Sequence, residues 1–150
     1  MSLRMDYQAA SPEWMKALGA VHAFVARSGL SHSLVELVYL RISQINGCAY
    51  CVDDHSRALL KAGTPAAKLA LVPVWRESGP WFDETERAAL AWAETVTGVA
   101  KRGVPDRAYA DAAAMFDPKQ LADLTIAIGL MNAYNRIAVS FGAGPAIPKS

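Results

Sequence analysis

The chain has 150 residues, a formal net charge of +1 and a hydrophobic fraction of 53%. This length predicts a single domain with its own core, and the near-neutral charge without a basic run argues against a nucleic acid partner. The first ten residues lack the pattern of a secretory signal, and the longest apolar run is far shorter than the roughly 18–20 residues of a membrane span, so we expect a cytoplasmic protein that does not bind membranes.

Helical periodicity runs through the chain and predicts an all-α fold of six or seven helices. The sequence Ser-Pro-Glu at 11–13 combines an N-cap, a first-turn proline and a first-turn acid, so it opens a helix that continues to about Ala26. Ser31 or Ser33 caps a second helix, whose apolar residues extend to Ile45. This second segment is rich in β-branched residues, but it is long and lacks strict alternation, so a helix is preferred over a strand.

The third predicted helix begins near Cys48 and ends at Gly63, a typical residue after a helix C-terminus. Proline, glycine and aspartate signals then bound the remaining predicted helices, which cover about 64–72, 83–97, 105–116 and 119–141. We expect a loop over 75–81 and a break between Gly98 and Gly103. No segment has the composition of a linker, so the predicted domain covers 11–142, with an N-terminal extension over 1–10 and a loose C-terminal tail over 143–150.

The most informative motif is Cys48-Ala-Tyr-Cys51 followed by His55, which holds both cysteines of the chain. The preceding Asn46-Gly47 is a turn signal, so the cysteines lie at the start of a helix. With about 100° per residue, positions 48, 51 and 55 fall within roughly 60° of one another and share a helix face. In a reducing compartment, a close cysteine pair is catalytic or binds metal more often than it is a structural disulfide.

A redox site needs a thiolate, and three features of the motif favour one. The helix N-terminus supplies a positive dipole end, the second thiol can donate a hydrogen bond, and His55 can accept the proton directly or through water. Helix-end electrostatics favours Cys48 as the attacking thiol, whereas the i, i+4 relation with His55 favours Cys51. Either thiol, once oxidised to a sulfenic acid, can condense with the other to a disulfide. Glu36 can orient His55 if its helix packs alongside.

A metal site is the main alternative. The motif C-x-x-C-x-x-x-H could supply three ligands to zinc, with Glu36, His22 or His32 as the fourth, but no second cluster completes such a site. His22 and His32 are otherwise interpreted as ordinary surface or capping residues. Three of the four tryptophans, Trp75, Trp81 and Trp92, are interpreted as core or interface packing rather than a substrate platform.

Two segments carry a resemblance to a known family. The segment from Glu36 to His55 reads ELVYLRISQINGCAYCVDDH, and the late segment 130–137 reads LMNAYNRI. Together they resemble the alkylhydroperoxidase D-like core of the carboxymuconolactone decarboxylase superfamily, in its peroxidase-related branch. The resemblance covers most of the chain and implies an all-α alkylhydroperoxidase D-like fold that assembles into trimers or hexamers. The hydrophobic excess over the usual value of about 45–50% agrees with such an interface.

The resemblance also implies an activity, namely the reduction of organic hydroperoxides by paired cysteines in antioxidant defence. It assigns Cys51 as the peroxidatic thiol, Cys48 as the resolving thiol, His55 as the base and Glu36 as its partner. It implies no cofactor beyond the redox-active disulfide, and an external dithiol that restores the thiols. A lipoyl-bearing protein can be that reductant, and a peroxiredoxin can be the client.

One residue departs from the family pattern. The best-known members carry a histidine immediately before the second cysteine, where this chain has Tyr50. A phenol with an ordinary pKa of about 10 is no base at neutral pH, although it can donate a hydrogen bond, so Tyr50 is an auxiliary candidate only. The decarboxylase branch generally lacks the cysteine pair, which argues against lactone decarboxylation. The remaining alternatives are a general thiol-disulfide oxidoreductase with weak peroxidase activity and a zinc-stabilised module without enzymatic activity.

Overall fold

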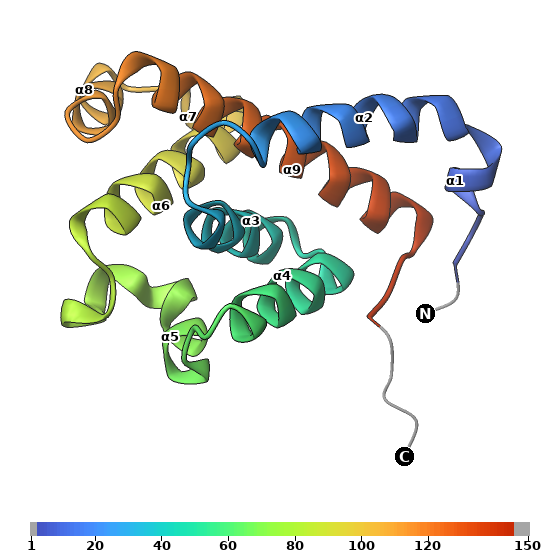
Figure 1. The fold of residues 1–150 in the computed structure, drawn as a ribbon, viewed down its shortest axis with the longest axis horizontal. Helices are drawn as coiled ribbons and strands as arrows, with labels where there is room; N and C mark the ends of the chain where they lie inside the picture. The colour runs from blue at the N-terminus through green and yellow to red at the C-terminus, as the bar shows by residue number, and fades with distance from the viewer. Residues whose placement is uncertain (1–2, 146–150) are drawn as a thin grey trace.

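Every regular element of the computed structural model is helical, and the model describes residues 3–145. In this part of the chain there are nine α-helices, two 3-10 helices and no strand, which confirms the predicted all-α fold (Figure 1). The elements are α1 Tyr7–Ala10, α2 Pro12–Val25, α3 His32–Asn46, α4 Ala49–Lys61, α5 Ala66–Leu71, η1 Val72–Glu77, η2 Gly79–Trp81, α6 Glu84–Thr97, α7 Val99–Arg102, α8 Asp106–Ala113 and α9 Pro118–Phe141.

Helix α3 is the centre of the fold. Its main neighbours are α4, α6 and α9, and Figure 1 shows α2 and α9 crossing above it while α4 lies below. Each residue from 34 to 40 is buried. A helix that is apolar nearly all round must be covered on every side, which explains why this short segment occupies the middle. The same central helix carries the buried carboxylate Glu36, so the fold positions a charged group deep among apolar neighbours.

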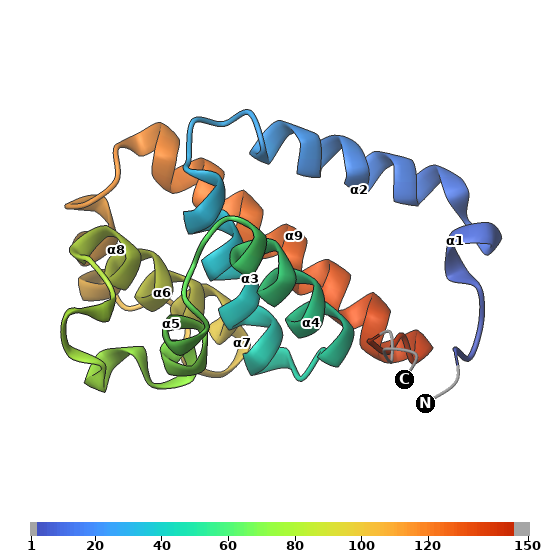
Figure 2. The ribbon, with the colours of Figure 1, turned by 60° about the horizontal axis from the view of Figure 1, so that its bottom comes forward.

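The N-terminal segment returns to the end of the last helix. The Arg4 backbone N–H donates to the Phe141 carbonyl oxygen at 2.8 Å, and the Tyr7 ring stacks on the Phe141 ring with centroids 5.2 Å apart. Figure 2 shows α1 on the same side of the molecule as the end of α9, and Tyr7 of α1 lines a pocket together with Tyr50 and Cys51 of α4. Contacts between distant parts of the sequence therefore hold α1 near the cysteine motif.

Most predicted helix starts agree with the structure. Ser31, not Ser33, caps α3 by accepting a hydrogen bond from the Leu34 N–H, and Asp83 and Asp117 each form a capping box at the start of α6 and α9. These caps satisfy backbone N–H groups that have no partner within the helix, so their positions in the sequence define the helix starts well.

Three local expectations need correction. The segment 75–81, expected as a loop, lies largely in the 3-10 helices η1 and η2, because prolines at their first turns favour a tight turn. The short helix α7 fills the expected break between Gly98 and Gly103. Helix α8 ends at Ala113, before the expected end near residue 116. The N-terminal extension contains the single turn of α1, which Asp6 caps. In the expected C-terminal tail, 143–145 is not helical, and the rest lies outside the described residues.

The membrane expectation can be compared with the helices directly. Within residues 3–145, no helix combines the length and the apolar composition that crossing a bilayer requires.

Candidate active site

The cysteine motif begins at the turn that connects α3 to α4. Gly47 ends α3 in the left-handed conformation, with φ +69°, and the next backbone N–H, that of Cys48, donates to the Ser43 carbonyl oxygen at 3.0 Å. Glycine adopts this conformation without the steric cost that a Cβ brings. The Asn-Gly turn signal therefore has a physical basis, since it lets one residue end α3 and the next residue cap α4.

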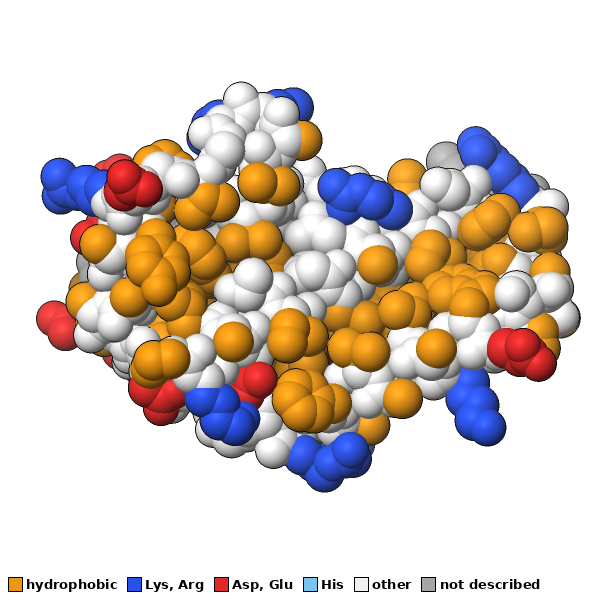
Figure 3. Space-filling view, turned by 90° about the horizontal axis from the view of Figure 1, so that it is seen from above, with side chains coloured by type: hydrophobic (Ala, Val, Ile, Leu, Met, Phe, Trp, Pro, Cys, Tyr) orange, Lys and Arg blue, Asp and Glu red, His pale blue; other side chains and the backbone are white. Residues whose placement is uncertain are grey.

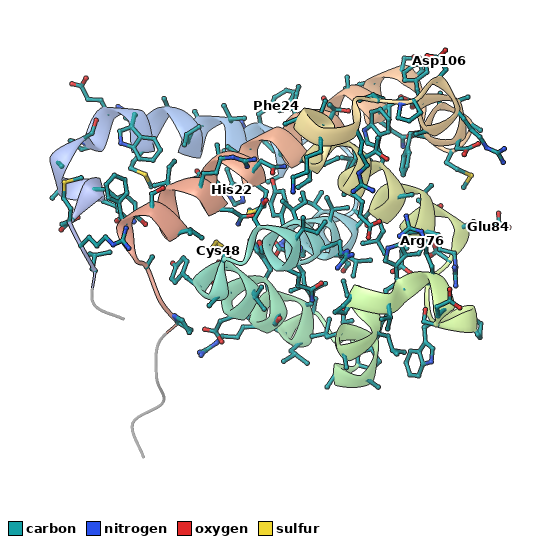
Figure 4. The ribbon with its side chains drawn as sticks, turned by 180° about the vertical axis from the view of Figure 1, so that it is seen from behind. His22, Phe24, Cys48, Arg76, Glu84 and Asp106 are labelled. Atoms are coloured by element: carbon teal, nitrogen blue, oxygen red, sulfur yellow. A yellow bond between two sulfur atoms is a disulfide. The ribbon has the colours of Figure 1, made fainter. Side chains whose placement is uncertain are left out.

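Cys48 is the N-cap of α4, and its sulfur accepts a hydrogen bond from the Cys51 N–H at 3.3 Å. The two cysteines form a disulfide across one turn, and both are buried. Figure 4 shows Cys48 at the start of α4, with His22 between α2 and this region. The structure therefore places the sulfur atoms at a helix N-terminus, where the dipole stabilises a negative charge on a reduced cysteine.

Glu36 and His55 meet across the α3–α4 interface. The His55 Nδ1 atom lies 2.8 Å from the Glu36 Oε2 atom, and each residue has a relative exposure of only 7%. Because Nδ1 is engaged with a carboxylate, the bond fixes the ring orientation and leaves Nε2 for a second partner. The expected contact between Glu36 and His55 is thus present, as in the carboxylate–histidine pairs that hold a base in place.

A pocket of about 190 Å³ opens onto Cys51 and His55. Cys48 does not line it, so only one of the two cysteines borders the space in which a small molecule would bind. Its walls come from four helices and are largely aromatic or apolar; the other lining residues are Tyr7, Gln8, Met15, His22, Tyr50, Asp54, Met131, Tyr134, Ile137 and Ala138. Apolar walls with a few polar groups are typical of small-molecule sites.

Tyr50 lines this pocket with a relative exposure of 44%. Partial burial, followed by the negative charge of Asp54 and the neighbouring Tyr7, raises the pKa of the Tyr50 phenol above its ordinary value. Tyr50 therefore stays protonated at neutral pH and can offer a hydrogen bond to a ligand, but it cannot accept a proton as a base.

Sequence analysis did not single out Tyr39, which packs directly on the site. Its ring lies 5.2 Å from the His55 ring and 6.2 Å from the His22 ring, centroid to centroid, and it is completely buried. Burial, and then the negative charge of Glu36, raise its pKa. In the sequence Tyr39 reads as one more core residue of an apolar helix, so no pattern distinguishes it.

The other two histidines also lie near this cluster. The His32 Nε2 atom is 3.8 Å from the Glu36 Oε1 atom, and His22 lines the pocket beside Cys51. Both had been interpreted as ordinary surface or capping residues. The i, i+4 spacing of His32 and Glu36 was available in the sequence, whereas the approach of His22 depends on how α2 crosses α3.

Helix α9 supports the turn before Cys48 through buried amides. The Asn135 amide donates to the Ser43 hydroxyl at 3.0 Å, and the Asn46 amide donates to Asn132 and Asn135 oxygens at 3.0 Å each. Asn135 has no exposed surface, so its hydrogen bonds offset the cost of burying an amide. The late segment 130–137 thus contributes to the site by fixing the end of α3.

The side chains considered as zinc ligands in the sequence analysis do not form a ligand cluster in the described residues. Among residues 3–145, no group of three or more His, Cys, Asp or Glu side chains is placed to hold a metal ion. Both sulfur atoms are in the disulfide, and His55 Nδ1 is bonded to Glu36.

Two of the three tryptophans interpreted above are packing residues, as expected. Trp75 and Trp92 are buried, and their indole N–H groups donate to Glu94 and Thr125 at 3.0 and 2.9 Å. Trp81 differs, with a relative exposure of 43%.

Comparisons with known proteins agree with this geometry. The model of the carboxymuconolactone decarboxylase family matches residues 12–95. The uncharacterised protein YdfG of Bacillus subtilis is 32% identical over 142 residues, which cover 95% of this chain and 96% of YdfG. A crystal structure from Agrobacterium tumefaciens, of a protein of unknown function associated by name with AhpD and antioxidant defence, is 41% identical, with a TM-score of 0.93 and coverage of 98% of this chain and 100% of that chain.

A more local match concerns a named enzyme. The alkyl hydroperoxide reductase AhpD of Rhodopseudomonas palustris is 40% identical over 45 residues, which are 30% of this chain and 25% of AhpD. The match therefore covers only about a quarter of that AhpD sequence. The family that this chain shares with AhpD includes enzymes. On the family match, the nearly full-length relatives and the helical fold, this chain belongs to the carboxymuconolactone decarboxylase family, among its alkylhydroperoxidase D-like members.

Proposed function

We propose that this protein is a thiol-dependent peroxidase that reduces organic hydroperoxides through Cys51 and Cys48. One observation carries the proposal: Cys51 and His55 line the same pocket, while Cys48, outside that lining, is bonded to Cys51 and His55 is held by a buried carboxylate. A nucleophile, a resolving thiol and an oriented base are what a two-cysteine peroxidase requires. Cys51 is assigned as the attacker because it, and not Cys48, is accessible from the pocket.

The first step oxidises Cys51. His55 accepts the thiol proton at Nε2, directly or through one water, and the thiolate attacks the terminal oxygen of the hydroperoxide. The O–O bond breaks, Cys51 becomes a sulfenic acid, and the alkoxide takes the proton from His55 to leave as an alcohol. Glu36 stabilises the imidazolium that forms transiently, because its carboxylate lies 2.8 Å from Nδ1.

The second step closes the disulfide. The Cys48 thiol attacks the Cys51 sulfur, the S–O bond breaks, and the hydroxyl leaves as water with the Cys48 proton. The side chains are within bonding distance across the first turn of α4. An external dithiol then attacks the disulfide, becomes oxidised itself and returns both cysteines to thiols. Its approach is through the pocket, so Cys51 receives the first attack.

The pocket favours a small organic hydroperoxide over a long lipid. A volume of about 190 Å³ lies below the roughly 300–1,000 Å³ of sites for drug-sized ligands. Tyr134 and Tyr50 supply aromatic surface, and the Tyr50 hydroxyl is proposed as a hydrogen-bond donor to a peroxide oxygen. A lipoyl group, which is a narrow dithiol on an aliphatic arm, is a suitable reductant, and a peroxiredoxin is a suitable protein client.

Self-association would explain a hydrophobic face on the surface of the protein. Figure 3 shows hydrophobic side chains gathered on the face above α2 and α9. Phe24 of α2, labelled in Figure 4, has a relative exposure of 46%. Apolar groups gathered on one face are typical of subunit interfaces, so we propose that the protein assembles through this face into a trimer or hexamer.

Peroxide consumption by the purified protein with dihydrolipoamide tests the function. We expect turnover with cumene and tert-butyl hydroperoxide that disappears in Cys51→Ser. Without the dithiol, the Cys48→Ser variant should consume about one peroxide per subunit and then stop. Turnover of a disulfide substrate without peroxide turnover would instead assign a general thiol-disulfide oxidoreductase, and full peroxidase activity in Cys51→Ser would refute the mechanism.

A further inference from the structure

The buried carboxylate of Glu36 contacts two histidines, one on each oxygen. Its Oε2 atom is 2.8 Å from His55 Nδ1 and its Oε1 atom is 3.8 Å from His32 Nε2. The two imidazoles differ in exposure, because the His55 side chain is 9% exposed and the His32 side chain 70% exposed. Glu36 therefore links a histidine beside Cys51 to a histidine at the surface.

A second cavity lies at the outer part of this link. It has a volume of about 30 Å³, and His22, His32 and Glu36 are its polar lining residues. A space of at least about 10–15 Å³ holds one water where two to four polar groups can bind it. Since 3.8 Å is too long for a direct hydrogen bond, a water in this cavity is the natural bridge between Oε1 and Nε2.

The proposed redox cycle includes a proton transfer that this connection between His32 and His55 could serve. In the peroxide step the Cys51 proton passes through His55 to the alkoxide and does not leave the site. Reduction of the disulfide differs, because a dithiol that attacks as a thiolate supplies one proton fewer than the two cysteines need. His55, which could supply that proton, is buried beside the substrate pocket. A bound hydroperoxide or dithiol fills that pocket and removes water from it. Proton exchange with the solvent then needs a second route, and the small cavity is separate from the pocket apart from their shared lining residue His22.

We propose that His32 is the solvent-facing end of a proton route that runs through Glu36 to His55 and so to Cys51. This inference rests on the proposed redox function and assigns a role to a residue outside the four that perform the chemistry. During disulfide reduction, His32 gives a proton through water to Glu36, Glu36 gives a proton to His55 Nδ1, and His55 gives its Nε2 proton to the Cys51 thiolate. Solvent then returns a proton to His32, and the route itself consumes no oxidant or reductant.

The groups around Glu36 support this direction of transfer. Three histidines from different places surround it or its cavity: His55 on α4, His32 on α3 and His22 on α2. The fourth titratable neighbour, Tyr39, stays protonated because burial and Glu36 raise its pKa, so it does not compete for the proton. Imidazole exchanges protons readily near neutral pH, which suits His32 to the outer position.

The test compares wild type with His32→Gln in weakly buffered solution at pH 7. Gln keeps the polarity of the site but cannot carry the proton. We expect peroxide turnover to fall roughly tenfold, less than the about 10²–10⁴-fold typical of a direct general base, and to recover when free imidazole is added. The matched control is Arg27→Gln, an exposed cation of the same α2–α3 connection, which should resemble wild type and not respond to imidazole.

A reaction that does not involve peroxide separates this inference from the proposed function. Stopped-flow reduction of the Cys48–Cys51 disulfide by dithiothreitol needs proton delivery to the cysteines but no peroxidase activity. If peroxide is not consumed but His32→Gln slows this reduction and imidazole restores it, the proton route stands without the peroxidase. An unchanged rate in His32→Gln, or a loss that imidazole does not restore, overturns the route. Equal thermal midpoints of the two proteins should accompany the expected result.

Discussion

Substitution of Gly47 and of Gly63 by alanine tests how the fold positions the cysteine pair. Both glycines follow a helix in the left-handed conformation, with φ +69° and +90°. Both are followed by a residue whose N–H bonds back into that helix, Cys48 to Ser43 at 3.0 Å and Thr64 to Leu59 at 2.9 Å. At neither position would an added Cβ meet an atom within 4 Å. The two turns at the ends of α4 are therefore equivalent except for the residue that follows.

The size of the expected stability loss follows from the space around the two glycines. Because there is open space at both sites, the cost of Gly47→Ala is only that of the left-handed conformation, about 1–2 kcal/mol. In a chain of this size 1 kcal/mol lowers the thermal midpoint by about 2–4 °C. Gly63→Ala should lose a similar amount. Only Gly47→Ala moves the residue that caps α4 with its sulfur, so only this variant should slow peroxide-driven disulfide formation.

Urea unfolding of the reduced proteins measures the stability, and stopped-flow tryptophan fluorescence with cumene hydroperoxide measures the rate of disulfide formation. Equal stability losses with a slower rate in Gly47→Ala alone are the expected outcome. If Gly63→Ala slowed the reaction as much as Gly47→Ala, the effect would come from general loosening of α4, and the positional argument would be refuted. A Gly47→Ala protein as stable as wild type would show that the backbone relaxes out of the left-handed conformation.

Three further predictions concern separate features. Cys48→Ser should accumulate a sulfenic acid on the peroxidatic thiol after one equivalent of peroxide, and dimedone labelling followed by mass spectrometry detects it. Tyr39 has a buried hydroxyl without a hydrogen-bond partner in residues 3–145, so Tyr39→Phe should unfold in urea at least as late as wild type at pH 8. Burial and the charge of Glu36 raise the pKa of Tyr39; its contribution to stability is therefore complete below pH 10 and lost as the pH rises above it, and Tyr39→Phe should lose less stability than wild type between pH 8 and 11. Phe24→Glu should lower the molar mass measured by light scattering, whereas Val74→Glu, equally exposed but on η1, should leave it unchanged.

The sequence predicts local features of this protein far better than distant contacts. Caps at Ser31 and Asp83 can be recognised because the side chain and the N–H that it binds are three residues apart. The contact between Glu36 and His55 was predicted only conditionally, because it depends on the packing of α3 against α4. Tyr39 could not be singled out, since a buried tyrosine and a buried leucine occupy the same positions in a helical pattern.

Local contacts assemble the residues of the proposed reaction, whereas distant contacts form the pocket walls that select the substrate. The residues that carry the proposed reaction lie within the twenty positions from Glu36 to His55, so two helices and one left-handed turn are enough to assemble them. The pocket walls come from α1, α2 and α9 in addition to α4. Helices α1 and α2 are distant from α9 in the sequence, and the three are held together by contacts such as the stacking of Tyr7 on Phe141. A substitution in these walls can change which molecule reaches Cys51 without disturbing the bond between Glu36 and His55. Substrate choice in this protein is therefore expected to depend on the first and last helices, and the reaction on the central two.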